Sequence, residues 1–99
     1  MRHDERDLER RCIDHARRNG WDCWKNENNG NNGIPDHSLL KGGRFIMVEF
    51  KRSADARIRP EQIRWKERHP ETIYFVHDFE TFTKIIEIPQ KSDKNAKIR

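Results

Sequence analysis

The sequence predicts a single α/β domain in which a mixed β-sheet is flanked by helices in the order α-β-β-β-α-β-α. Three observations predict this class. The chain has 99 residues, enough for one compact domain with one modest core. Two β-prone runs in its middle flank a Gly42-Gly43 turn, as in a hairpin. A helical segment then separates this hairpin from one more β-prone run, which is the spacing of a parallel crossover.

The start of the chain has the pattern of an amphipathic helix, from Asp4 to about Asn19. Its apolar positions recur every four residues, at Leu8, Cys12 and Ala16. Asn19-Gly20 then marks the helix end. A short extended segment is expected at 21–25, and the Asn- and Gly-rich segment 26–33, which has no apolar residue, is expected to be a loop.

The sheet and the last two helices occupy the rest of the domain. Pro60 suits the first position of a helix, which is expected to end near Arg68. The expected strands lie at 34–40, 44–50 and 72–77, and the last helix at 79–86. The run 45–48 is apolar on both faces, which indicates a central strand covered on both sides.

Proline also marks the expected domain boundary. Pro89 follows the last helical pattern, and the residues after it are polar and basic. We therefore expect an ordered domain over residues 1–88 and a basic, disordered tail over residues 89–99.

Composition limits the partners and the compartment. The formal charge of +4 and the pI of about 9.3 favour a polyanionic partner. Only 32% of the residues are hydrophobic, so we expect a homodimer to add buried apolar surface. The chain lacks a transmembrane run and a secretory signal, and Cys12 and Cys23 lack zinc-ligand spacing. These features predict a cytoplasmic protein with reduced thiols.

Two acids and a lysine fall within the expected hairpin. Glu49 and Lys51 are two residues apart, so in a strand both side chains leave the same face of the sheet. Asp36 lies near the start of the preceding strand, and a hairpin can bring it opposite that face. Two carboxylates bind a hard cation such as Mg²⁺, and a neighbouring ammonium can orient or activate a water. This arrangement is suited to the hydrolysis of a phosphodiester.

Each residue also has a simpler interpretation. Asp36 follows a proline, where aspartate is common in turns, and Glu49 with Lys51 could form a surface ion pair worth ~0–1 kcal/mol. However, Glu49 follows an apolar run, where burying a charge is costly unless a cation or a partner compensates it. The three residues together therefore favour a metal site.

The same residues, in this order of elements, resemble the PD-(D/E)xK nuclease superfamily, whose fold is the restriction-endonuclease-like mixed sheet. The fuller pattern is similar to the stand-alone VRR-NUC domains, small nucleases that are common in phages and also found at the ends of larger DNA-repair proteins. It covers about residues 5 to 80, and it consists of four short motifs in the right order. The motifs are Glu9 in the first helix, Gly33-Ile34-Pro35-Asp36, Val48-Glu49-Phe50-Lys51, and Gln62 in the following helix.

The resemblance implies a Mg²⁺- or Mn²⁺-dependent endodeoxyribonuclease. Asp36 and Glu49 would ligate the metal, with the backbone carbonyl oxygen of Phe50 as a further ligand. Lys51 would position the attacking water or stabilise charge on the phosphorane. The implied substrate is branched DNA such as a Holliday junction, which a homodimer would cut at two paired sites.

The remaining implied roles are less specific. Glu9 would touch the metal directly or through water, and Gln62 would hold the edge of the active site or contact the substrate. Glu5 lies one helical turn before Glu9 on the same side and is the alternative to it; the spacing from the helix end favours Glu9. The family aspartate is often followed by Arg, whereas His37 stands here, and nearby Lys or Arg could replace the lost phosphate contact.

Other interpretations stay open at the level of sequence. The chain could be a DNA-binding module of the same fold without catalysis, or a structural interaction protein whose acids pair with arginines. Basic residues near the proposed site would neutralise phosphates or form a solvated charged face. These are Lys51, Arg52, Arg57, Arg59, Arg64 and Lys66. Trp21, Trp24 and Trp65 are expected in the core or in a dimer interface rather than stacked on bases.

Overall fold

The computed structural model describes residues 5–27 and 32–88. The expected tail at 89–99 lies outside the described residues, as does part of the expected loop at 26–33. The elements are α1 (Glu5–Arg18), β1 (Asp22–Lys25), β2 (His37–Lys41), β3 (Arg44–Phe50), α2 (Pro60–Arg68), β4 (Ile73–Val76) and α3 (Phe79–Glu87). The order α-β-β-β-α-β-α predicted from the sequence is confirmed.

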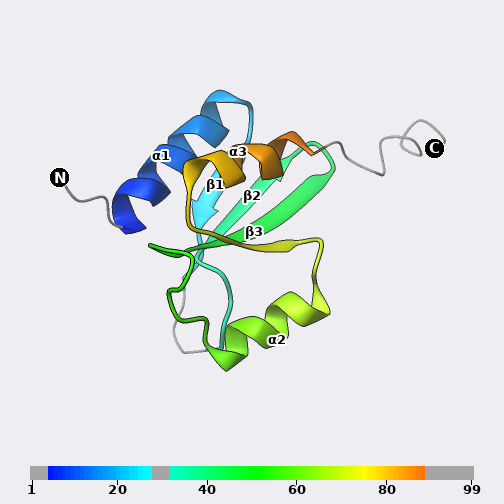
Figure 1. Cartoon of the computed structure of the whole chain (residues 1–99). Coiled ribbons are helices and arrows are strands. Elements are labelled where there is room, and N and C mark those ends of the chain that lie inside the picture. Colours follow the sequence, from blue (N-terminus) through cyan, green and yellow to red (C-terminus); the bar gives the residue numbers. More distant parts are fainter. Residues whose placement is uncertain (1–4, 28–31, 89–99) are drawn as a thin grey trace.

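The four strands form one mixed sheet in the order β1-β2-β3-β4 (Figure 1). β1 and β2 are antiparallel, and so are β2 and β3, which the Gly42-Gly43 turn joins. β4 pairs with β3 in parallel after the α2 crossover. The central position predicted for β3 is therefore confirmed, as is the crossover.

The core lies between one face of the sheet and the helices α1 and α3. Alternate residues of β3 point to this face, and Ile46, Val48 and Phe50 are fully buried. The Phe50 ring packs on the Phe82 ring of α3 with centroids 6.0 Å apart. α1 contributes the stripe predicted for it: Leu8, Cys12, Ile13 and Ala16 are all buried.

The opposite face of the sheet is only partly covered. α2 packs near β4 (Figure 1), and Ile73 is buried on that side. Phe45 of β3 is 42% exposed and Trp24 of β1 is 44% exposed. The prediction that both faces of the 45–48 run are covered is thus wrong at Phe45, because α2 does not extend over β1 and β2.

The start of β2 also differs from the prediction. A strand was expected from Ile34, but β2 begins at His37. Pro35 has no amide hydrogen to donate to a ladder, and the amide of Asp36 donates to a side chain, the Glu49 carboxylate, at 3.1 Å. Asp36 therefore lies just before the strand and outside it.

Both cysteines are free thiols, as predicted. Cys12 lies in the core, where burial raises the pKa of its thiol to about 12. Among the described residues, no helix combines the length and the apolar character needed to cross a bilayer.

Candidate functional site

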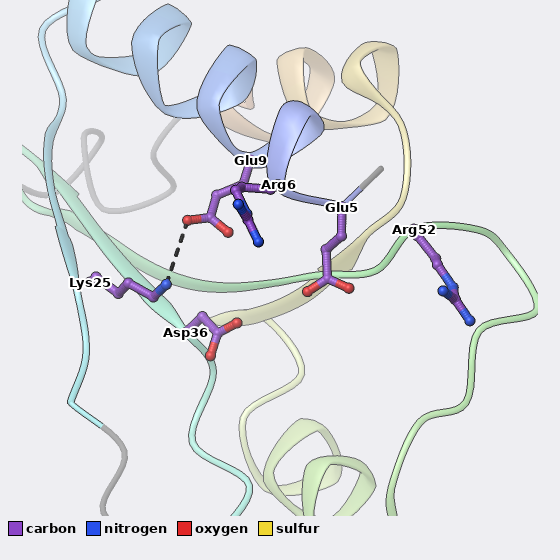
Figure 2. Close-up of a pocket in the computed structure, with 6 residues that line it drawn as sticks. All are labelled: Glu5, Arg6, Glu9, Lys25, Asp36 and Arg52. Carbon is purple, nitrogen blue, oxygen red and sulfur yellow. Dashed lines mark ion pairs between the residues drawn. The ribbon is translucent and has the colours of Figure 1, made fainter. Parts of the chain in front are cut away.

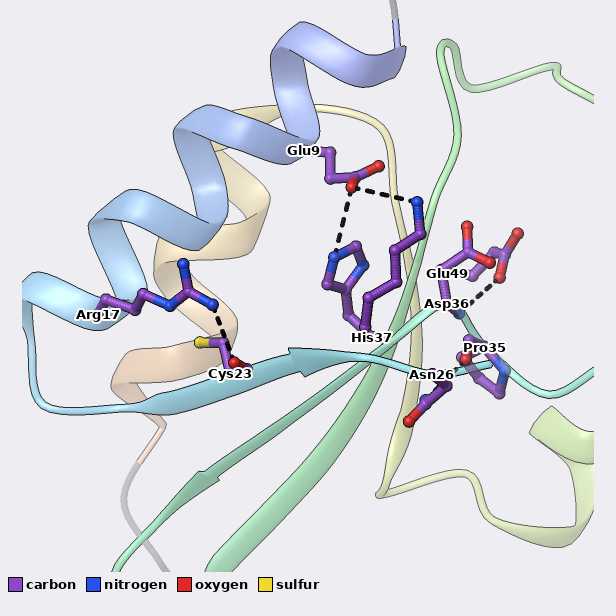
Figure 3. A network of polar contacts seen from close by, with 9 residues as sticks. Glu9, Arg17, Cys23, Asn26, Pro35, Asp36, His37 and Glu49 are labelled. Carbon is purple, nitrogen blue, oxygen red and sulfur yellow. Dashed lines mark hydrogen bonds and ion pairs between the residues drawn. The ribbon is translucent and has the colours of Figure 1, made fainter. Parts of the chain in front are cut away.

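Asp36 and Glu49 meet at the end of the sheet where β2 begins (Figure 3). The hairpin register sets His37 opposite Val48, so the residues that flank this pair, Asp36 and Glu49, share the other face. The Asp36 amide donates to Glu49 Oε1 at 3.1 Å. The structure therefore brings together the two acids that the sequence singled out.

Glu49 is a buried carboxylate with an unusual pKa. It is 9% exposed, and its pKa is raised from 4.5 to about 6. Burial is the largest cause, and the charge of Asp36 adds to it, while Lys51 and the Asp36 amide act in the opposite direction. The protein thus keeps two mutually repelling carboxylates together, an arrangement that a bound cation would stabilise.

Lys51 directly follows β3, on the same face as Glu49, and its ammonium is held by two hydrogen bonds beside the Glu49 carboxylate. Its Nζ lies 3.9 Å from Glu49 Oε2, and it donates to Gln62 Oε1 at 3.0 Å and to the Arg57 carbonyl at 3.1 Å. The ammonium is therefore held beside the two acids.

Gln62 links this lysine to the start of α2. It is 2% exposed, and its Oε1 also accepts a hydrogen bond from the Arg59 amide at 2.9 Å. The same oxygen therefore caps the helix and orients Lys51. The structure thus places Gln62 at the edge of the site, where it touches Lys51.

The Phe50 carbonyl is oriented toward the β2 side of β3, beyond the last residue that β2 pairs with. The Met47 and Lys51 amides bond to β4, so the carbonyl of Phe50, at the alternate position, faces the β2 side. β2 pairs with β3 only as far as Val48. The Phe50 oxygen therefore points past the end of the β2 ladder, to the side on which Asp36 lies.

The first turns of α1 supply two more carboxylates. Glu5 and Glu9 line one cavity of about 510 Å³ together with Asp36 (Figure 2). Glu9 Oε2 lies 3.4 Å from His37 Nε2 and 3.8 Å from Lys25 Nζ. The charge of Glu5, by contrast, raises the pKa of Glu49. Both acids reach the cavity, but Glu9 already has cationic or polar partners.

His37 points to the opposite face from Asp36 and is 5% exposed. Its ring packs edge-on against Phe50 with centroids 5.4 Å apart, and its Nδ1 has no hydrogen-bond partner within residues 5–27 and 32–88. Burial lowers its pKa, while the charges of Glu9 and Asp36 act in the opposite direction. His37 therefore contacts Glu9 from the core side and does not line the cavity that contains Asp36.

Several oxygen donors of the kind that a hard divalent cation prefers thus lie around the start of β2. Asp36 and Glu49 provide carboxylates, Phe50 provides a carbonyl, and Glu5 or Glu9 could contribute across the cavity. In the described part of the chain, no three His, Cys, Asp or Glu side chains form a ready-made cluster. Water or substrate oxygens would therefore have to complete the coordination of any cation bound here.

Asn26 holds the segment around Asp36 in place, although no sequence pattern indicated it. Its Nδ2 donates to the Pro35 carbonyl at 2.9 Å, and its Oδ1 accepts from Ser38 Oγ at 3.0 Å. Its backbone amide donates to the Asp36 carbonyl at 2.6 Å. Asn26 therefore holds the segment that carries Asp36, but in the sequence it is one of many asparagines in a polar run.

Gly33 fixes the other end of this segment. Its φ is +84°, and a Cβ placed there would lie 2.6 Å from backbone atoms of Glu61 in α2. Only glycine suits this approach, which brings the segment before Asp36 against the helix that carries Gln62.

Two of the candidate phosphate-binding residues, Arg52 and Lys66, lie in different environments. Arg52 lines the cavity beside Asp36, and so does Arg6 (Figure 2), which the sequence analysis did not select. Lys66 instead donates to the carbonyls of Pro70 and Ile73 at 2.8 and 2.6 Å. Lys66 therefore fastens α2 to the start of β4.

The tryptophans have different environments. Trp21 is buried in the core, and Trp65 Nε1 donates to the Asn32 carbonyl at 2.7 Å. The expectation of core packing is confirmed for Trp21, whereas Trp24 lies exposed beside Phe45 with ring centroids 6.4 Å apart.

Comparison with known proteins identifies the fold. No family model matches the chain, and no curated protein matches it. A solved structure described as "VRR_NUC domain" matches with a TM-score of 0.74 at 24% sequence identity. The match covers 87% of this chain and 97% of that chain. The predicted resemblance and the predicted fold class are thereby confirmed as a fold: the chain has the architecture of a VRR_NUC domain.

Proposed function

We propose that this chain is a Mg²⁺- or Mn²⁺-dependent endodeoxyribonuclease. The observation that carries the proposal is the convergence of Asp36 and Glu49, with Lys51 held beside them, on a fold that supports a nuclease-family domain. Glu49 stays buried next to a second carboxylate although this raises its pKa. A divalent cation between the two acids would explain that arrangement.

The mechanism assigns a separate task to each residue. A bound Mg²⁺ or Mn²⁺ would supply a water of lowered pKa and would stabilise charge on the phosphoryl oxygens. Asp36, Glu49 and the Phe50 carbonyl would hold it, with Glu9 or Glu5 contributing from α1, directly or through water. Lys51 positions the attacking water or stabilises charge on the phosphorane.

Gln62 and the Arg57 carbonyl orient the Lys51 ammonium, which has three donors. Two of its hydrogens are taken by these oxygens, which leaves one for a water or a phosphate oxygen. Gln62 therefore acts through Lys51 as a positioning residue.

The substrate is proposed to be branched DNA, for example a Holliday junction, with recognition of the backbone rather than of bases. A homodimer would place two such sites for paired cuts. The exposed side chains Trp24, Leu40 and Phe45, on the sheet face that α2 leaves open, support a protein contact there. Light scattering with size-exclusion chromatography checks it: the proposal expects a dimer that Phe45→Ser with Trp24→Ser converts to monomer.

The activity test compares linear, flap and four-way junction DNA, with Mg²⁺, Mn²⁺ or EDTA. Asp36→Asn, Glu49→Gln and Lys51→Met are each expected to lower the cleavage rate about 10²-fold or more, since each removes a group that acts in the transition state. Glu80→Gln, on the exposed side of α3, is the matched control and should cleave normally. Normal cleavage by all three site variants would refute the proposal, and DNA binding without cleavage by the unaltered chain would favour the non-catalytic module instead.

A further inference from the structure

A second cavity, of about 280 Å³, lies between α1 and β1. It shares Arg6, Glu9 and Lys25 with the larger cavity that contains Asp36, so the two cavities adjoin along α1. The second cavity adds two further arginines, Arg10 and Arg17, which have no role in the mechanism above.

The three arginines follow one line along α1. They are separated by four and then seven residues, which at 100° per residue keeps all three within about 40° of each other around the helix. At a rise of 1.5 Å per residue the line extends about 16 Å. It starts above Asp36 with Arg6 (Figure 2) and ends with Arg17 near Cys23 of β1 (Figure 3).

These cations outnumber the acids and have only weak internal partners. Arg6, Arg10, Arg17 and Lys25 line the second cavity with two carboxylates, Glu9 and Asp14. Arg10 pairs with Asp7 at 2.8 Å in an exposed ion pair, and the exposed Lys25 lies 3.8 Å from Glu9. Pairs of this kind are worth ~0–1 kcal/mol, so a phosphate can replace the partner.

Arg17 uses one of its nitrogens to donate to the Cys23 carbonyl at 3.0 Å (Figure 3). This bond fixes the side chain beside β1 and leaves its other donors for a ligand. The bond therefore orients Arg17 at the far end of the line without using up its charge.

We infer that this line of cations, Arg6, Arg10, Arg17 and Lys25, is a track for the phosphate backbone that leads one nucleic-acid strand to Asp36. The inference rests on the proposed function and extends it by assigning the direction in which the strand leaves the site. One strand of a duplex carries a phosphate every 3.4 Å along the axis, so about 16 Å spans roughly five phosphates. If four cations along this path each neutralise a phosphate, the affinity for DNA should fall steeply as salt is added. The logarithm of the association constant should then fall with the logarithm of the salt concentration with a slope of about −3 to −4.

The test measures binding of a fluorescein-labelled four-way junction by the full chain in EDTA, so that no cleavage occurs. Arg10→Gln with Arg17→Gln is expected to raise Kd at least tenfold and to reduce the salt slope by about 2. The matched control removes two cations outside both cavities, Arg18→Gln with Lys84→Gln, and is expected to change Kd less than threefold. If the loss of Arg17 unfolds the chain, the single variant Arg10→Gln is measured in place of the double variant, because it breaks only an exposed ion pair.

A second readout separates this inference from the proposed function. With Mn²⁺, hydrolysis of the small diester bis(4-nitrophenyl) phosphate needs the metal site but no track. The double variant Arg10→Gln with Arg17→Gln, here called the track variant, should therefore keep the kcat/KM of the unaltered chain. Absence of this activity in the unaltered chain would refute the proposed function. The binding assay would then still decide whether the arginines bind DNA. Junction binding by the track variant as tight as that of the unaltered chain would overturn the track.

Discussion

The two faces of β3 differ in what their side chains contribute. Ile46, Val48 and Phe50 point to the face beneath α1 and α3, where apolar burial stabilises the fold. Glu49 lies on the other face, followed there by Lys51 just after the strand, and the buried Glu49 carboxylate with its raised pKa destabilises the fold. Strand alternation therefore lets neighbouring residues of one strand serve stability and chemistry separately.

The largest expected effect tests the apolar face. Phe50→Ala should lower the free energy of unfolding by about 3–5 kcal/mol, because it leaves a cavity against Phe82. Phe45→Ala, on the same strand but 42% exposed, should cost less than about 1 kcal/mol. Urea unfolding measures both, and equal losses would show that the two faces do not differ as described.

The next effect concerns how the Asp36 segment is held. Gly33→Ala should lower the free energy of unfolding by more than about 2 kcal/mol, because it combines a strained φ with a clash against the Glu61 backbone. Gly42→Ala is the control: its φ is also positive, at +59°, but a Cβ there meets nothing within 4 Å, so only about 1–2 kcal/mol is expected. Urea unfolding of both variants checks this, and a Gly33→Ala protein no less stable than Gly42→Ala would contradict the close approach.

A smaller effect of opposite sign is expected on the polar face. The pKa of Glu49 is about 6 in the folded chain against 4.5 ordinarily, so the folded state binds a proton more tightly than the unfolded state. Stability without metal should therefore fall as the pH rises from about 4.5 to about 6, by about 2 kcal/mol in total.

Glu49→Gln should remove most of that pH dependence and stabilise the metal-free protein by about 2 kcal/mol at pH 7.5, since it removes the buried charge. Urea unfolding at pH 4 and pH 7.5 in EDTA makes the comparison, with the exposed Glu80→Gln as the control. A Glu49→Gln protein that is less stable than the unaltered chain at pH 7.5 would mean that the carboxylate is well compensated without a metal.

The smallest effect concerns Asn26. Asn26→Ala should cost about 1 kcal/mol of stability through two lost side-chain hydrogen bonds, and should also lower cleavage because the Asp36 segment is released. Ser38→Ala removes only one of these bonds and should retain more of the activity. Cleavage kinetics with thermal melting would show it, and unchanged cleavage by Asn26→Ala would mean that the Asp36 segment needs no such support.

The strand and helix patterns were readable where local chemistry decides them. The bounds of Arg44–Phe50 and the start of the helix at Pro60 were predicted correctly, because a Gly-Gly turn precedes the strand and a first-position proline begins the helix. Asp36 was expected inside a strand because the 34–40 run is β-prone, but Pro35 and the Glu49 carboxylate end the ladder earlier.

What depends on packing could not be read from the sequence. Exposure of Phe45 depends on how far α2 extends over the sheet, and the places of Glu5 and Glu9 depend on how α1 docks. Asn26 acts through contacts with Pro35 and Ser38, residues 9 and 12 positions away, and no local pattern indicates them.

Binding of Mn²⁺, followed by isothermal titration calorimetry at pH 7.5, tests most directly whether Asp36 and Glu49 hold a divalent cation. Saturable binding is expected for the unaltered chain and for Glu80→Gln, with at least a tenfold loss of affinity in Asp36→Asn and in Glu49→Gln. Equal Mn²⁺ affinity in all four proteins would contradict the metal site on which the account depends.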